Sequence, residues 1–214
     1  MKKVISFCLW GDKPKYTIGA LKNADIAPFI YPGWEVWIYA ADNVPQDIIN
    51  SLSKNCRIIK GGTGNWDSMF LRFYPISDPE VDVFISRDTD SRLNYRERRA
   101  VDQWLASDKK LHIMRDHKEH TTLILGGMWG FRGTIEQDIK EIIRLFITTR
   151  GRSNHLDIDQ AFLREVIYPN YRDSAFVHDE IFEMLPFPSP RENNEYVGAP
   201  YNENNELEIP FKGR

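Results

Sequence analysis

The sequence predicts an α/β fold in which helices flank a mostly parallel central sheet. Short runs rich in Val, Ile and aromatic residues alternate along the chain with segments of helical periodicity, which favours parallel strands joined by helices. The chain has 214 residues, 42% hydrophobic and 13% aromatic, enough for one sizeable core. The acidic triplet Asp88-Thr89-Asp90 follows one strand-like run, and ligands of open α/β sheets bind outside the carboxyl ends of strands.

In the first half of the chain, turn residues separate short apolar runs. Trp10-Gly11-Asp12 forms a turn into the first helix, which we expect to end before Pro28 because proline lacks the amide hydrogen. Pro45 opens the second helix and Asp67 can cap the third. We therefore expect strands at 4–9, 35–40, 57–60 and 81–86, and helices at 16–27, 45–54 and 67–73.

In the second half, Asn94 followed by Glu97 resembles a capping box that opens a helix over 94–107. Further strands are expected at 111–114 and 128–131, and helices at 135–148 and 159–167. The stretch 186–208 is rich in Pro, Asn and Glu and has no periodicity. We expect one domain over 1–185 and a C-terminal segment over 186–214 that packs on it or leads to a linker.

Composition excludes several classes of protein. The net charge of -3 argues against a broad basic surface for nucleic acid. No segment approaches the roughly 20 apolar residues that span a bilayer, and the apolar start is too short for a signal peptide, so we expect a soluble cytoplasmic protein without a membrane span. Cys8 and Cys56 lie in apolar runs and are expected to be buried thiols.

The triplet Asp88-Thr89-Asp90 is the strongest functional signal. Two carboxylates that flank one residue at the end of a buried strand offer hard oxygen ligands to a divalent cation such as Mn²⁺ or Mg²⁺, which a diphosphate can share. The triplet therefore indicates a site for a nucleotide-sugar. The alternative is a polar turn that only closes the strand.

Four strings in this order carry a resemblance: FISRDTDSR, IMRDH, ILGGMWGF and DIDQAFL. Together they resemble the nucleotide-sugar glycosyltransferases of the GT-A fold, in particular a group from bacteria and chlorella viruses whose viral members decorate the capsid protein. The resemblance covers about 4–198. It implies a single GT-A-like domain, a UDP-sugar donor, Mn²⁺ or Mg²⁺, a glycan or glycoprotein acceptor, transfer with retention and, for a viral protein, the host cytoplasm.

The resemblance also implies roles for individual residues. Asp88 and Asp90 match the DxD motif that binds metal and donor, and His178 is the candidate for a third metal ligand, although Asp179-Glu180 departs from the usual Gly and Lys there. Asp159-Gln160 matches the pair that faces the reacting sugar. The remaining donor residues are Leu9, Trp10, Gly11, Tyr16 and Arg72.

Several of these positions have alternative interpretations. A transferase needs a carboxylate or amide at the reacting sugar, and Asp159 or, second, Asp157 suits this role, but either could simply cap a helix. Arg72 or Arg87 could bind phosphate or pair with a nearby aspartate. We place four residues in the acceptor cleft, the last of which could equally belong to the core: Asp116, His117, Gly127 and Trp129.

Two other functions compete with glycosyl transfer. A phosphatase or phosphotransferase can use the first aspartate of such a motif as a nucleophile, although Arg92 stands where that class expects Thr or Val. A non-catalytic sugar-binding module is the other alternative. His117 and His120 have a spacing seen in metal sites, but they lack the companion ligands of zinc and suit a polar loop.

Overall fold

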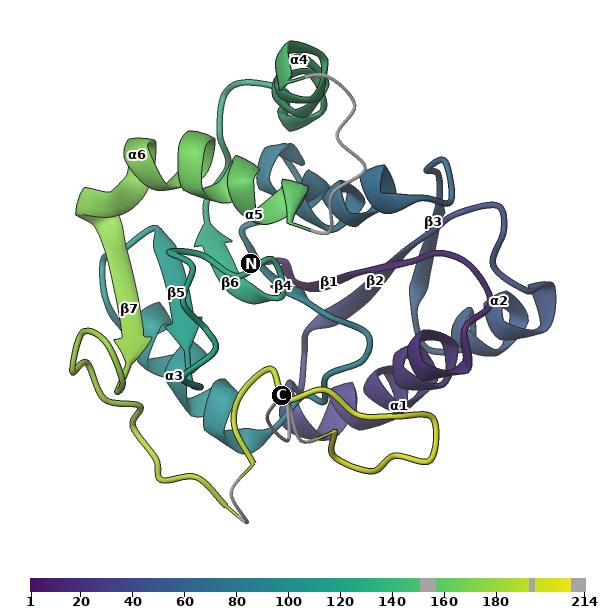
Figure 1. The fold of residues 1–214 in the computed structure, drawn as a ribbon, viewed down its shortest axis with the longest axis horizontal. Coiled ribbons are helices and arrows are strands. Elements are labelled where there is room, and N and C mark those ends of the chain that lie inside the picture. Colours follow the sequence, from purple (N-terminus) through teal and green to yellow (C-terminus); the bar gives the residue numbers. More distant parts are fainter. Residues whose placement is uncertain (151–156, 193–194, 209–214) are drawn as a thin grey trace, which may run out of the picture.

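A seven-stranded sheet forms the centre of the computed structural model, which describes residues 1–150, 157–192 and 195–208 (Figure 1). The strands are β1 (Lys3–Leu9), β2 (Glu35–Ala40), β3 (Arg57–Lys60), β4 (Val83–Arg87), β5 (Leu111–Arg115), β6 (Met128–Arg132) and β7 (Ala175–Asp179). Their order is β3-β2-β1-β4-β6-β5-β7. Only β6 runs antiparallel to its neighbours, β4 and β5, so the predicted mostly parallel α/β sheet is confirmed.

Helices cover both faces of this sheet. One face carries α1 (Pro14–Ile30), α2 (Gln46–Leu52) and α3 (Tyr95–Ala106); the other carries the 3-10 helix η1 (Trp66–Ser77), α4 (Ile139–Arg150) and α5 (Ile158–Phe162) (Figure 1). A π-helical stretch (Leu163–Ile167), α6 (Tyr168–Tyr171) and a 3-10 turn (Arg172–Ser174) lead from α5 to β7. No described helix is long and apolar enough to cross a membrane.

The two-residue period of β1 explains the two layers of the core. Ile5, Phe7 and Leu9 pack into the cluster under α1 to α3, whereas Val4 and Cys8 pack into the cluster under η1, α4 and α5. Because both faces of the parallel strands are covered, the strands read as continuous apolar runs. Because β1, β2, β4 and β5 run in the same direction, their carboxyl ends lie at one edge of the sheet.

The structure corrects three local expectations. The first helix does not end before Pro28 but continues to Ile30: the proline removes one backbone hydrogen bond, and the Tyr31 amide still closes the last turn on the Ala27 carbonyl. The cap of η1 is Asn65, whose side chain accepts from the Asp67 amide, and not Asp67 itself. Strand β7 was not expected from sequence.

The C-terminal segment packs along the edge of the sheet that carries the carboxyl ends. Phe187 and Val197 form a small cluster with Met114 and Met128. The Tyr201 amide donates to the carbonyl oxygen of Asp90 at 2.8 Å. These contacts bring residues far apart in sequence to the end of β4.

Candidate active site

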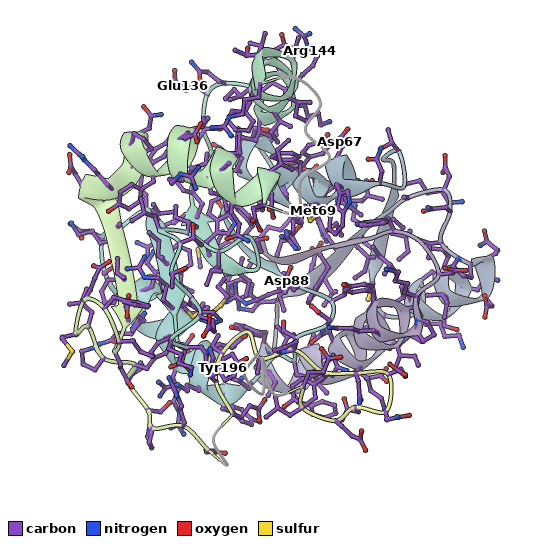
Figure 2. All side chains as sticks on the ribbon, viewed as in Figure 1. Asp67, Met69, Asp88, Glu136, Arg144 and Tyr196 are labelled. Atoms are coloured by element: carbon purple, nitrogen blue, oxygen red, sulfur yellow. The ribbon has the colours of Figure 1, made fainter. Side chains whose placement is uncertain are left out.

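A pocket of about 520 Å³ opens at the carboxyl ends of β1 and β4. Figure 2 shows Asp88 near the middle of the molecule, between the labelled side chains of Met69 in η1 and Tyr196 in the C-terminal segment. All of the predicted donor and catalytic residues line this pocket: Leu9, Trp10, Gly11, Tyr16, Arg72, Asp88, Asp90, Asp157, Asp159 and Gln160.

The Asp88 carboxylate is open to the pocket and sits against a glycine backbone. Its side chain is 44% exposed. A Cβ at Gly127 would overlap the Asp88 Oδ2 atom, and a Cβ at Gly126 would overlap the side chains of Arg72 and Asp159. The glycine pair therefore lets the chain before β6 approach the acidic groups closely. Gly127 borders the site through its backbone and does not itself line the pocket.

Arg72 joins the two acidic positions of the pocket. Its guanidinium, on a side chain that is 6% exposed, bonds to Asp88 and donates from Nη2 to Asp159 Oδ2 at 2.7 Å. Burial lowers the pKa of Arg72, but the adjacent carboxylates outweigh burial and raise the pKa above its ordinary value. A permanently charged guanidinium therefore lies between the triplet and α5. Of the two alternatives given for Arg72, the structure shows the pairing with aspartates.

Asp159 is a buried carboxylate and not a helix cap. Asp157 occupies the cap position of α5 and makes no side-chain cap bond, whereas Asp159 lies inside the first turn. Its Oδ1 accepts from the Gln160 amide at 2.8 Å. Burial, more than the charge of Asp88, raises the pKa of Asp159, while Arg72 opposes the rise. Asp159 and Gln160 thus line the same pocket as the triplet.

Asp90 is held by a cation from α1. Its Oδ2 lies 3.1 Å from Lys15 Nζ, which is also 2.6 Å from Glu208 of the C-terminal segment. Burial and the nearby Asp88 raise the pKa of Asp90. A divalent cation would relieve the effect of Asp88 on Asp90, because a cation favours the ionised form of a carboxylate.

The fit of a divalent cation rests on these two carboxylates. Among the described residues, no group of three or more His, Cys, Asp or Glu side chains is placed to hold a metal. Mg²⁺ and similar hard cations commonly use one or two carboxylates and take their other ligands from water and substrate phosphates. Asp88 and Asp90 therefore fit a cation that arrives together with a diphosphate.

His178 is not brought to the two aspartates, contrary to the expectation that it completes a metal site. It lies in β7 with 1% of its surface exposed, and its Nδ1 is 2.9 Å from His112 Nε2. Its Nε2 is 2.9 Å from the Gln103 side-chain oxygen. Burial lowers the pKa of His178 to about 4. Both ring nitrogens are thus engaged within the core, and the side chain does not line the pocket.

Three residues expected in an acceptor cleft have structural surroundings instead. Asp116 is fully buried, and its carboxylate binds the Arg96 guanidinium at 2.8 Å and accepts from the Val197 amide at 2.9 Å. The His117 ring stacks on Tyr196 at 4.3 Å. Trp129 is fully buried, with its ring packed against Phe73 and Phe84. None of the three lines the pocket.

The pocket also contains residues that we did not predict. Asn43 follows β2, accepts from the Gly11 amide at 2.9 Å and donates to the Gly64 carbonyl at 3.1 Å, which ties together the loops after three strands. Its position after the neighbouring strand could have identified it, because parallel strands end at the same edge. Trp66 packs edge-on against Trp10 at 5.4 Å. Gly198 belongs to the C-terminal segment, for which no local pattern exists.

Comparisons by sequence do not place the chain. No family model matches it, and no curated protein matches it. The similarities found lie among solved structures.

One similar structure is a glycosyltransferase involved in the glycosylation of the major capsid of PBCV-1, with a TM-score of 0.53, 15% identity, and coverage of 84% of this chain and 82% of that one. A second is the mannosyltransferase PcManGT from Pyrobaculum calidifontis in complex with GDP-Man and Mn²⁺, with a TM-score of 0.50, 10% identity, and coverage of 86% and 58%. A third is 4-diphosphocytidyl-2C-methyl-D-erythritol synthase from Anaerococcus prevotii DSM 20548, with a TM-score of 0.50, 11% identity, and coverage of 88% and 93%.

At these identities the similarity concerns the fold, and the third structure shows that the same fold also serves enzymes other than glycosyltransferases. The strand order, the acidic triplet after β4 and the similarity to these structures all indicate the same fold. The chain has the GT-A fold, and its structural neighbours include glycosyltransferases.

Proposed function

We propose that this protein transfers a sugar from a UDP-sugar donor to a glycan or glycoprotein acceptor, with retention and with the help of Mn²⁺ or Mg²⁺. The observation that carries this proposal is the single pocket in which Asp88, Asp90, Arg72 and Asp159 converge at the carboxyl ends of the strands. A pocket of about 520 Å³ lies within the range of sites for small molecules and cofactors, typically about 300–1,000 Å³.

The uracil ring is assigned to the loop after β1. Leu9, Trp10 and Gly11 present backbone at the sheet edge, and the half-buried ring of Tyr16 in α1 provides a flat neighbour. The positive φ of Gly11, 73°, turns the chain toward Asn43. A base held here would place its diphosphate toward the triplet, because Tyr16 and Asp90 line the same pocket.

Asp88 and Asp90 are proposed to hold the divalent cation, which when bound stabilises the charge that develops on the leaving diphosphate. Arg72 contributes a guanidinium at the same place, and Lys15 a second cation at Asp90. Breaking a sugar-phosphate bond makes the leaving group more negative, so preformed positive charge at this position lowers the barrier.

Asp159 and Gln160 are proposed to act at the reacting sugar. Arg72 holds the Asp159 carboxylate in place through Oδ2, and the Gln160 amide binds Oδ1. A buried carboxylate opposite the leaving group can stabilise an oxocarbenium-like sugar or attack it, which is the requirement for retention. Asp157 lines the same pocket and is the second candidate.

The test is turnover of a panel of UDP-sugars with and without Mn²⁺, read as UDP release, in the presence and absence of glycan acceptors. We expect metal-dependent release for at least one donor, and an anomeric configuration in the product that matches the donor. Asp102→Asn on the exposed face of α3 is the control variant. Donor binding without release of UDP under any condition would identify a sugar-binding module, and release of phosphate from simple monoesters would identify a phosphatase.

A further inference from the structure

A second cavity, of about 510 Å³, lies near edge strand β3 on the face of the sheet that carries η1 and α4. Trp37 and Tyr39 of β2 line it together with Tyr74 of η1. Leu71 lines this cavity, whereas the adjacent Arg72 lines the candidate active site, so η1 borders both. The two cavities have almost the same volume, and both are of a size that binds small molecules.

Three cations line this cavity without a carboxylate partner within ion-pair distance among the described residues: Arg57, Lys60 and Lys140. Aromatic rings hold two of them. The Arg57 guanidinium lies over the Trp37 ring at 4.3 Å, and the Lys140 ammonium lies over the Tyr74 ring at 5.2 Å. Such contacts are worth about 0.5–1 kcal/mol at exposed sites, so they orient the cations without neutralising them.

Two carboxylates, which accept hydrogen bonds, also line the cavity. Asp78 and Asp138 each use Oδ1 to accept a backbone amide, from Glu80 at 2.9 Å and from Lys140 at 3.0 Å. The Oδ2 atom of each carboxylate has no partner among the described residues. These carboxylates can accept hydrogen bonds from hydroxyl groups.

The Tyr39 phenol is a further polar group of the cavity. The residue is 5% exposed, and its hydroxyl makes no hydrogen bond with the described part of the chain. Burial first, and then the charge of Asp78, raises the pKa of this phenol, which keeps it neutral and able to donate. A ligand oxygen in the cavity can accept a hydrogen bond from this hydroxyl.

We propose that this cavity binds a hydroxylated ring that carries one anionic group, that is, a sugar acid or a sugar phosphate. The three cations select the anion, and Asp78 and Asp138 accept from ring hydroxyls. The same two carboxylates disfavour polyanions such as nucleic acid and nucleoside triphosphates. The site is separate from the donor pocket and does not depend on the proposed transferase activity.

The experiment is a titration of the full chain, followed by amide NMR, with glucuronate, glucose 6-phosphate, glucose and inorganic phosphate. We expect one or both of the charged sugars to shift resonances of β2, β3 and η1 and to bind at least about tenfold more tightly than glucose or inorganic phosphate. The glucuronate and glucose 6-phosphate arms distinguish a carboxylate from a phosphate ligand. Equal binding of inorganic phosphate and glucose 6-phosphate, or shifts confined to the Asp88 pocket, would overturn the proposal.

Variants sharpen the assignment. The double substitution Arg57→Gln with Lys140→Gln should weaken the charged sugar at least about tenfold, and Tyr39→Phe, which removes only the hydroxyl, severalfold. Lys22→Gln on the exposed side of α1 is the matched control and should bind normally. UDP binding should be unchanged in all of these variants, so this test and that of the proposed function fail separately. Unaltered sugar affinity in both the double variant and Tyr39→Phe would remove the site.

Discussion

Carboxylates stand at the ends of three strands at the same edge of the sheet, yet they have opposite surroundings. After β4, the Asp88 side chain is 44% exposed and faces a pocket. After β5, Asp116 is completely buried, and at the end of β7, Asp179 is completely buried and paired with Arg115 at 2.6 Å. All three bind an arginine, so the difference lies in the access that the surrounding chain leaves.

The surroundings of Asp116 show what closes such a position. Arg96 from α3 and Arg191 from the C-terminal segment bind its carboxylate, and the Val197 amide binds it from the same segment. No lone pair is left for a substrate. Asp88, in contrast, has a glycine backbone on one side and open space on the other. The Asp88 carboxylate therefore stays open to the pocket although Arg72 of η1 binds it, whereas two segments enclose the carboxylate of Asp116.

The largest expected effect is on folding. Asp116→Ala should lower the free energy of unfolding by about 3–5 kcal/mol, because it leaves buried guanidinium charge without its partner. Asp88→Ala should change it by no more than about 1 kcal/mol, because the buried Arg72 keeps Asp159 as a partner and the Asp88 side chain is 44% exposed. Urea denaturation of both variants measures the difference. Equal destabilisation would mean that Asp88 is also a structural residue.

The next effect is on the chemical step. Asp159→Asn should reduce turnover of the UDP-sugar by at least about a hundredfold, or about 2.7 kcal/mol of transition-state stabilisation, with little change in donor affinity. The substitution keeps the shape and one hydrogen-bond acceptor but removes the charge. Steady-state kinetics together with donor binding checks it. Near-normal turnover would remove Asp159 from the mechanism.

The buried histidine pair predicts a dependence of stability on pH. Burial lowers the pKa of His178 to about 4, and burial together with His178 lowers that of His112 well below 6.5. The unfolded chain therefore binds protons that the folded chain does not, so stability is full above about pH 6.5 and falls toward pH 4 by about 2 kcal/mol. Urea midpoints at pH 7 and 4.5 measure this loss. His178→Gln should flatten the dependence; an unchanged slope would assign it to other groups.

A smaller effect is expected at the base-binding end of the pocket. Tyr16→Ala should weaken UDP by about tenfold, or about 1.4 kcal/mol, through lost contact with the uracil ring. Mn²⁺ should still raise the UDP affinity of this variant by the same factor as in the unaltered chain, because Asp88 and Asp90 are intact. Calorimetry of UDP distinguishes the two effects. Unchanged UDP affinity would move the base elsewhere.

Local sequence patterns predicted most of the fold and the open half of the site. The strand expected at 4–9 forms, and Asn94 caps its helix as expected by accepting from the Glu97 amide at 2.9 Å, although the Glu97 carboxylate binds Tyr31 and Arg87 and does not complete a capping box. Asp88 and Asp90 could be identified as candidate site residues because they directly follow a strand in the sequence, and ligands of such sheets bind outside the carboxyl ends of strands.

Local patterns failed where distant segments meet. Asp116 and Val197 are in contact although 81 residues separate them, and His112 and His178 although 66 do. No local pattern shows that a distant segment will donate hydrogen bonds to the Asp116 carboxylate, or that both ring nitrogens of His178 will have partners in the core. The same limit applies to Gly198, which reaches the pocket from the C-terminal segment.

The claim that the open carboxylates form a donor site with a shared cation is tested most directly by calorimetry of UDP binding with and without Mn²⁺. In the unaltered chain we expect Mn²⁺ to raise UDP affinity at least about tenfold. The substitution Asp90→Ala should abolish that increase and leave the far-UV circular dichroism spectrum unchanged. Asp102→Ala, on the exposed side of α3, should behave as the unaltered chain does. The same Mn²⁺-dependent increase in Asp90→Ala would contradict the account.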